Sequence, residues 1–207
     1  MGRESLASLI FERKNEYFPR HQLSDFYEDY ALLKARLGGK AFRFGQADEH
    51  HLFVYNLGEP YQPQPDDYTL EVLMYGLQGQ ARDVFSQVNQ KAEVVRKAIC
   101  ADELFPGFQL DDFVFEPRGY SMNALRGREY VTLHVTPEEG GSYVSFETNL
   151  KDPSLYPSLI ARLIEVFQPT SYDEVVFGPQ IVKLKSVNED FHLRSEVCHK
   201  LESGYHV

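Results

Sequence analysis

Cysteine is scarce in this chain, and long apolar runs are absent. The two cysteines, Cys100 and Cys198, lie far apart in the sequence, so we expect a reduced intracellular chain without a disulfide framework. No segment approaches the roughly 20 apolar residues of a membrane span, and residues 1–5 lead into no signal-peptide core. These absences exclude secreted mini-proteins and predict a cytoplasmic protein.

Positive charge is also in short supply. The 207 residues include 21 Lys and Arg against 31 Asp and Glu, which gives a formal net charge of −10. This balance argues against nucleic acid or an anionic membrane as the main partner, and it attracts cationic small molecules. Because 43% of the residues are hydrophobic, the chain can bury a real core in one domain or a tight pair.

Several motifs that carry chemistry in other proteins are missing. No Cys-x-x-Cys occurs, and His50-His51 and Cys198-His199 are adjacent pairs whose side chains alternate to opposite faces, so we expect no metal. No glycine-rich phosphate loop is present. Ser121 lies outside any Gly-x-Ser-x-Gly elbow, which disfavours a hydrolase triad.

Two segments carry helix signals at both ends. Ser24 is the expected N-cap of a helix that stops at Gly38, and apolar residues recur between them at helical spacing. A second helix is expected from about residue 154 to residue 167, where Pro169 follows. Residues 82–100 are also helix-like, although Asn89 interrupts the pattern.

Much of the remainder alternates with period two, as half-buried strands do. We predict strands at 51–57, 68–75, 129–136 and 142–149, and one or two more within 172–185. A glycine-containing turn joins the third and fourth of these as a hairpin. The alternating residues 202–207 are where a further strand would be expected to continue. The fold class is therefore α+β, an antiparallel sheet covered on one face by helices.

The densest polar cluster surrounds the hairpin of residues 129–149. Ser121, His134, Glu138 and Glu147 lie on or beside strands whose other positions are apolar. A hydroxyl and an imidazole on neighbouring strands suit general acid–base chemistry. The alternative is a core histidine that is simply hydrogen-bonded to a hydroxyl.

A second cluster is acidic. Asp67, Thr69 and Glu71 share one face of the strand 68–75, and Glu147 lies on the corresponding face of its own strand. If this face is solvated, the carboxylates are ordinary surface. If a second layer covers it, they need a cation, and an organic diamine could bridge two of them.

Three segments carry a close resemblance to a known family. Residues 115–123 (FEPRGYSMN), 129–139 (EYVTLHVTPEE) and 142–150 (SYVSFETNL) resemble the eukaryotic S-adenosylmethionine decarboxylases, with weaker similarity at 11–15, 67–74 and 165–167. The resemblance implies a four-layer α-β-β-α sandwich of two antiparallel sheets. It covers essentially the whole chain, so residues 1–207 are predicted to form a single, N-terminally incomplete domain of this fold.

The resemblance also implies an activity and a site. Members of this family decarboxylate S-adenosylmethionine for spermidine and spermine synthesis. Their electron sink is a pyruvoyl group, which is made by self-cleavage at a serine. By resemblance, Phe115 stacks on the adenine, Glu138 holds the ribose hydroxyls, and Ser121 and His134 assist self-processing. The residues that match the putrescine site of the animal enzymes are Asp67, Thr69, Glu71, Glu147 and Phe177.

Two departures from the family pattern stand out. The Glu-Ser-Ser cleavage motif is expected some tens of residues before Arg13, a distance that this chain does not span, and Arg118 stands where most members have cysteine. Since no ordinary side chain supplies the electron sink, we expect the pyruvoyl group not to form in this chain and the chain to be inactive alone.

Three hypotheses remain open at this point. The chain is a decarboxylase by descent, a regulatory paralogue that activates a full-length homologue, or a putrescine- or nucleoside-binding module. A sandwich that lacks strands exposes sheet edges, so we expect it to associate, to misfold, or to be completed by a full-length homologue or a missing N-terminal chain.

Overall fold

The chain forms two compact units. The computed structural model describes residues 3–16, 18–138, 140–184 and 190–207. The first unit consists of Met1–Pro65, Gly178–Ile181 and Leu193–Val207, and the second of Asp66–Phe177 and Val182–His192. The single domain predicted for residues 1–207 stays a prediction.

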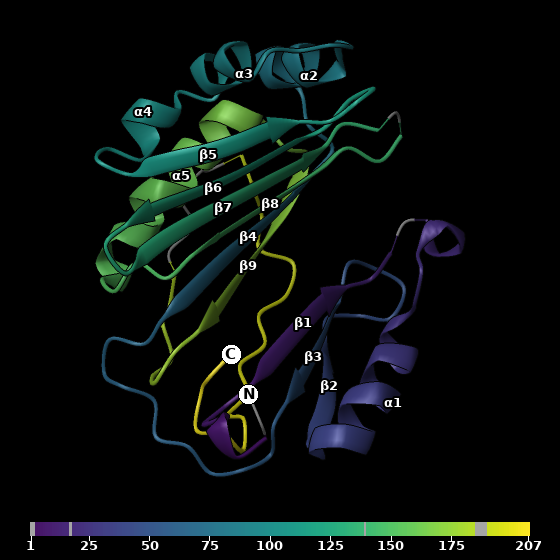
Figure 1. Cartoon of the computed structure of the whole chain (residues 1–207), viewed down its shortest axis with the longest axis vertical. Coiled ribbons are helices and arrows are strands. Elements are labelled where there is room, and N and C mark those ends of the chain that lie inside the picture. The colour runs from purple at the N-terminus through teal and green to yellow at the C-terminus, as the bar shows by residue number, and fades with distance from the viewer. Residues whose placement is uncertain (1–2, 17, 139, 185–189) are drawn as a thin grey trace. The chain divides into compact units, whose positions relative to one another are not determined.

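The second unit is built on a six-stranded antiparallel sheet with the strand order β5-β6-β7-β8-β4-β9 (Figure 1). The predicted strands at 68–75, 129–136 and 142–149 are confirmed, and the segment 172–185 supplies one strand, β9, in its described part up to residue 184. No range was predicted for β5 or β6, although Ser121 was expected on a strand beside that of His134. The strands are β4 (Thr69–Tyr75), β5 (Gln109–Val114), β6 (Tyr120–Arg126), β7 (Glu129–Thr136), β8 (Tyr143–Thr148) and β9 (Ser171–Phe177).

Helices cover one face of this sheet (Figure 1). The predicted helix at 154–167 is confirmed, with a 3₁₀ turn at its start. The segment 82–100 forms two helices instead of one, because Asn89 adopts a left-handed conformation with φ of 57° between them. The elements are α2 (Gly79–Ser86), α3 (Ala92–Ala98), α4 (Ala101–Leu104), η3 (Pro153–Leu155) and α5 (Tyr156–Phe167).

The core of this unit lies between the helices and the sheet. On β4, Leu70, Val72 and Met74 are fully buried toward the helices, while Thr69 and Glu71 belong to the opposite face. The helices contribute large apolar side chains to the same core. Each such side chain that is fully buried adds roughly 1.5–3 kcal/mol to the free energy of unfolding. These helix residues include Phe85, Val95, Ile160, Leu163 and Phe167.

An ion pair fastens the helices to the edge of the sheet. The guanidinium of Arg96 on α3 donates two hydrogen bonds to Asp112 on β5, at 2.6 and 2.8 Å, and the hydroxyl of Tyr120 donates a third at 2.9 Å. Burial by itself raises the pKa of Asp112, but these hydrogen bonds outweigh it and hold the pKa below its usual value. The network therefore fixes β5 and the start of β6.

The first unit has a three-stranded antiparallel sheet with the order β1-β3-β2 and one long helix. The ring of Phe26 on the helix stacks on Phe53 of β3, with 4.6 Å between the ring centroids. The predicted strand at 51–57 is confirmed as β3. The elements are η1 (Arg3–Ser5), β1 (Ile10–Lys14), η2 (Pro19–His21), α1 (Phe26–Leu37), β2 (Lys40–Phe44) and β3 (Leu52–Asn56).

The start of α1 differs from the prediction by one residue. Asp25, not Ser24, is the N-cap, because Asp25 and Glu28 form a reciprocal capping box. Ser24 instead accepts hydrogen bonds from Arg13, whose guanidinium also pairs with Asp29.

The end of the chain also differs from the expected pattern. Residues 202–207 form no named strand, since His206 makes only isolated bridges to Gly178 and Lys200.

The α+β class is confirmed, since each unit supplies an antiparallel sheet that carries helices. In the described ranges, no helix combines the length and the apolar character that crossing a bilayer demands.

Besides Asp112, a second acidic side chain lies on the helix-covered face of the second unit. Glu174 on β9 pairs in register with Val72, and burial raises its pKa to about 7. The folded pKa therefore lies above the unfolded value of 4.5, so the folded state binds more protons between these two values. The free energy of unfolding consequently falls as the pH rises through this window.

We predict that Glu174→Gln stabilises the protein at pH 8 but not at pH 4. The gain at pH 8 is about 2 kcal/mol, allowing for residual contact with water. Urea unfolding at both values measures it, with Glu93→Gln on α3 as the control. An equal gain in the free energy of unfolding at pH 4 and at pH 8 contradicts the raised pKa of Glu174.

Candidate functional site

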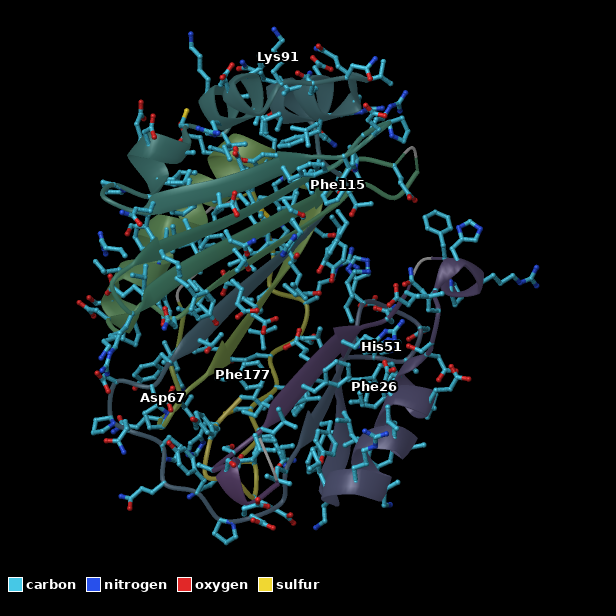
Figure 2. The ribbon with its side chains drawn as sticks, in the orientation of Figure 1. Phe26, His51, Asp67, Lys91, Phe115 and Phe177 are labelled. Carbon is cyan, nitrogen blue, oxygen red and sulfur yellow. The ribbon has the colours of Figure 1, made fainter. Side chains whose placement is uncertain are left out.

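Two loops lie at the same end of the six-stranded sheet. Because neighbouring strands are antiparallel, the β5–β6 loop and the β7–β8 loop lie at the same end of the strands. The first loop is closed by a hydrogen bond of 3.0 Å from the amide of Phe115 to the carbonyl of Gly119. The second contains Glu138, whose carbonyl accepts from the amide of Gly141 at 3.3 Å. Figure 2 shows Phe115 at this end of the sheet.

A hydroxyl and an imidazole face each other beside these loops. Ser121 on β6 is the register partner of His134 on β7, and both lie on the face away from the helices. Ser121 Oγ and His134 Nδ1 are 2.8 Å apart, a hydrogen bond in which the tautomer of the imidazole decides which group donates. His134 is exposed, so it is not the core histidine that the alternative interpretation required.

A cavity of about 850 Å³ opens between the two loops, and we call it the hairpin cavity. Its wall combines an aromatic ring, a guanidinium, a carboxylate and the Ser121–His134 pair. The ring of Phe115 is 46% exposed and meets Phe113 edge-on at 4.9 Å, so one of its faces is open to a ligand. The lining residues are Val88, Phe115, Pro117, Arg118, Gly119, Tyr120, Ser121, His134, Val135, Thr136, Pro137 and Glu138.

Two carboxylates lie opposite each other on the same face of the sheet. Glu71 on β4 and Glu147 on β8 are register partners, and both are half-buried. The hydroxyl of Tyr130 donates a hydrogen bond to Glu147. Because β-strands place same-face residues about 7 Å apart, this carboxylate pair lies one row of side chains from His134 and Ser145.

The pKa of Tyr130 is affected by the charges of Glu71 and Glu147. Burial raises its pKa most, and its hydrogen bond to Glu147 and the charges of Glu147 and Glu71 raise it further. Like charges directly opposite on neighbouring strands repel, so the row is a place where a cation is stabilised.

The remaining predicted residues lie farther along the sheet. Phe177 on β9 is buried and is the register partner of Thr69, while Asp67 precedes β4. Figure 2 shows Asp67 and Phe177 toward the end of the sheet opposite Phe115. In the part of the chain that the structure describes, no three His, Cys, Asp or Glu residues are grouped so that they could hold a metal ion.

Comparison with known proteins identifies the family. The family model for adenosylmethionine decarboxylase matches residues 1–206. The chain belongs to the adenosylmethionine decarboxylase family. It is 32% identical over 200 residues to the S-adenosylmethionine decarboxylase proenzyme of Leishmania donovani, covering 90% of this chain and 52% of the relative. The Xenopus laevis proenzyme is 32% identical over 193 residues, covering 89% of this chain and 57% of the relative.

A solved structure agrees with the fold. The monomer of the Trypanosoma brucei decarboxylase matches 82% of this chain and 64% of its own, with 30% sequence identity and a TM-score of 0.58. This match confirms the predicted decarboxylase fold. The chain spans about half the length of the curated relatives that it matches.

The structure brings the predicted decarboxylase-family residues into two groups. Phe115, Glu138, Ser121 and His134 line the hairpin cavity, and Glu71 joins Glu147 in the carboxylate pair. Sequence reasoning did not single out Tyr130 as a site residue, although its place on the polar face of β7 was a usable signal. It also missed Val88, which reaches the cavity from the loop between α2 and α3 and carries no sequence signal.

We predict that Glu147→Gln lowers the pKa of Tyr130. The substitution removes a charge and weakens an acceptor that together favour the protonated phenol. NMR titration of ring-labelled tyrosine measures the shift, and Tyr130→Phe assigns the resonance. Glu93→Gln, on the outer helix α3, leaves the titration unchanged. An unaltered Tyr130 titration in Glu147→Gln contradicts the contact.

Proposed function

We propose that this chain acts in cytoplasmic polyamine biosynthesis as an S-adenosylmethionine decarboxylase-family protein, and that the hairpin cavity binds the adenosine part of S-adenosylmethionine. The observation that carries the proposal is the Ser121–His134 contact of 2.8 Å inside a cavity that Phe115 and Glu138 flank. The printed names of its relatives, which are S-adenosylmethionine decarboxylase proenzymes, support it.

Four side chains of the cavity have a part in the proposed binding and chemistry. The open face of Phe115 stacks on the adenine ring, and the carboxylate of Glu138 accepts hydrogen bonds from the two ribose hydroxyls. Ser121 and His134 line the same cavity, and their hydrogen bond provides a path for a proton between Oγ and Nδ1. The wall thus offers an aromatic surface, an acceptor and a proton carrier in one place.

Decarboxylation also requires an electron sink. In the family, a pyruvoyl group supplies a carbonyl that accepts the electron pair left when carbon dioxide departs. The hydroxyl–imidazole pair facing the cavity fits the surroundings of such a group. The 207 residues contain no Glu-Ser-Ser sequence from which the family makes it. We therefore infer that this polypeptide by itself binds S-adenosylmethionine without turning it over.

The carboxylate pair supports a second ligand for the same protein. Putrescine carries two ammonium groups, which two carboxylates can bind. Glu71 and Glu147 face each other on neighbouring strands, and the hydroxyl of Tyr130 donates a hydrogen bond to Glu147. A dication placed over the pair relieves the repulsion between the two carboxylates. We propose that the row around Thr69, Glu71 and Glu147 binds putrescine, with Asp67 and Phe177 at its end.

We predict that the isolated chain binds S-adenosylmethionine and that Glu138→Gln weakens this binding roughly tenfold to a hundredfold, because charge-assisted hydrogen bonds to the ribose are lost. Titration calorimetry measures the affinity, and release of labelled carbon dioxide, expected to be nil, is followed in the same samples. Glu93→Gln serves as the matched control.

Two results would overturn this proposal. Equal affinities of the wild type and Glu138→Gln would remove the ribose contact. Carbon dioxide release from the pure chain, together with a borohydride-reducible adduct, would remove the inference that it does not act alone.

We predict that putrescine binds with a millimolar or lower dissociation constant and that Glu147→Gln weakens it at least tenfold. The variant keeps the shape of the site and removes one of the two charges that face the ligand. Calorimetry and putrescine-induced thermal stabilisation both report on it. A putrescine affinity that Glu147→Gln leaves intact contradicts the proposed site.

A further inference from the structure

The hairpin cavity contains a single basic side chain of fixed charge. Among its lining residues, Arg118 is the only Lys or Arg. Its guanidinium stays protonated at any physiological pH. In a chain with a formal net charge of −10, this places a permanent positive charge at a site meant for a small molecule.

Within the residues that the structure describes, no side-chain hydrogen bond or ion pair takes up the guanidinium of Arg118. It lies in the exposed loop between β5 and β6, and no described carboxylate pairs with it. Arg96 in the same unit shows the contrast, since Asp112 takes up its guanidinium with two hydrogen bonds. A guanidinium that no carboxylate engages can bind an oxyanion through two parallel N–H···O hydrogen bonds.

The cavity is also divided by charge. Glu138 accepts hydrogen bonds and therefore suits hydroxyl groups, whereas Arg118 only donates and therefore suits carboxylate or phosphate oxygens. About 850 Å³ is enough for a nucleoside together with a charged substituent. One ligand that carries both hydroxyls and an oxyanion can satisfy both residues.

We propose that Arg118 is a specificity-determining residue that makes the hairpin cavity prefer nucleosides bearing an oxyanion over those without one. The proposal rests on the nucleoside binding proposed above and adds the anionic group to it. A carboxylate, as in S-adenosylmethionine, and a phosphate, as in a nucleoside monophosphate, offer Arg118 the same chemistry.

This contact has a consequence for decarboxylation. The carboxylate leaves as carbon dioxide, so the decarboxylated product has no oxyanion for Arg118. The contact therefore stabilises the ground state of the substrate rather than the transition state. Arg118 accordingly sets the affinity for the substrate and its discrimination from the product.

The test uses two pairs of ligands that differ in one group. S-adenosylmethionine is compared with its decarboxylated form, and adenosine 5′-monophosphate with adenosine, by calorimetry at fixed ionic strength. The wild type is expected to bind at least one oxyanion ligand tenfold more tightly than the counterpart that lacks the oxyanion. Arg118→Gln is expected to abolish that ratio while it leaves adenosine binding within twofold. The pair that shows the larger ratio identifies carboxylate or phosphate as the preferred group.

A matched control comes from the opposite end of the same sheet. Arg128 is exposed in the turn between β6 and β7, so Arg128→Gln removes the same charge from the unit away from the cavity. It should keep the wild-type ratio, and circular dichroism melts check that both variants fold.

The outcomes separate this proposal from the proposed function. Adenosine binding without any oxyanion preference, or a preference that survives in Arg118→Gln, overturns the role of Arg118 and leaves nucleoside binding in place. Binding of adenosine 5′-monophosphate that depends on Arg118, without detectable adenosine binding, supports Arg118 and overturns nucleoside recognition. No binding of any of the four ligands overturns both.

Discussion

The register of the six-stranded sheet in the second unit is the constraint on which the site depends. Alternation along each strand sends one set of side chains into the helix-covered core and the other set to the opposite face. Because Val131, Leu133 and Val135 are buried, His134 must lie on the polar face, where Ser121 is its partner. A slip of one residue in β7 would turn the imidazole toward the core and its apolar residues toward solvent, so packing on one face fixes which side chains lie on the other.

The same register brings two carboxylates together at a cost in stability. Glu71 and Glu147 are direct neighbours across β4 and β8, and like charges in such pairs are unfavourable. Tyr130 compensates in part by donating a hydrogen bond to Glu147. A site of this kind is better suited to binding a cation than to stabilising the fold.

The hairpin cavity illustrates how loops add specificity to a rigid sheet. The strands place Ser121 and His134 at hydrogen-bond distance, while the two loops supply Phe115, Arg118 and Glu138 around them. The Arg96–Asp112–Tyr120 network holds the strands that carry the first loop, with the carboxylate of Asp112 only 3% exposed. Arg118 belongs to the first loop and takes no part in this network, so the loop chemistry and the framework rest on different residues.

Much of the local structure was predictable from sequence, because it depends on neighbours along the chain. The helix at 154–167 and the strands that carry Glu71, His134 and Glu147 follow from apolar spacing alone, and the motifs at 115–150 indicated the family. No strand range was predicted for β1, β2, β5 or β6. In β5, Asp112 interrupts the apolar pattern of the core face, where Arg96 of α3 pairs with it. The N-cap of α1 was misplaced for a similar reason, because Arg13 occupies Ser24.

The sequence by itself therefore determined which residue types were available and which face of each strand they occupy. Only the tertiary structure decided that Ser121 meets His134, that Glu71 faces Glu147, and that Arg118 shares a cavity with Glu138. Periodicity is a property of one strand, whereas pairing and loop convergence depend on strands far apart in the chain, whose register is set by the packing of the whole sheet.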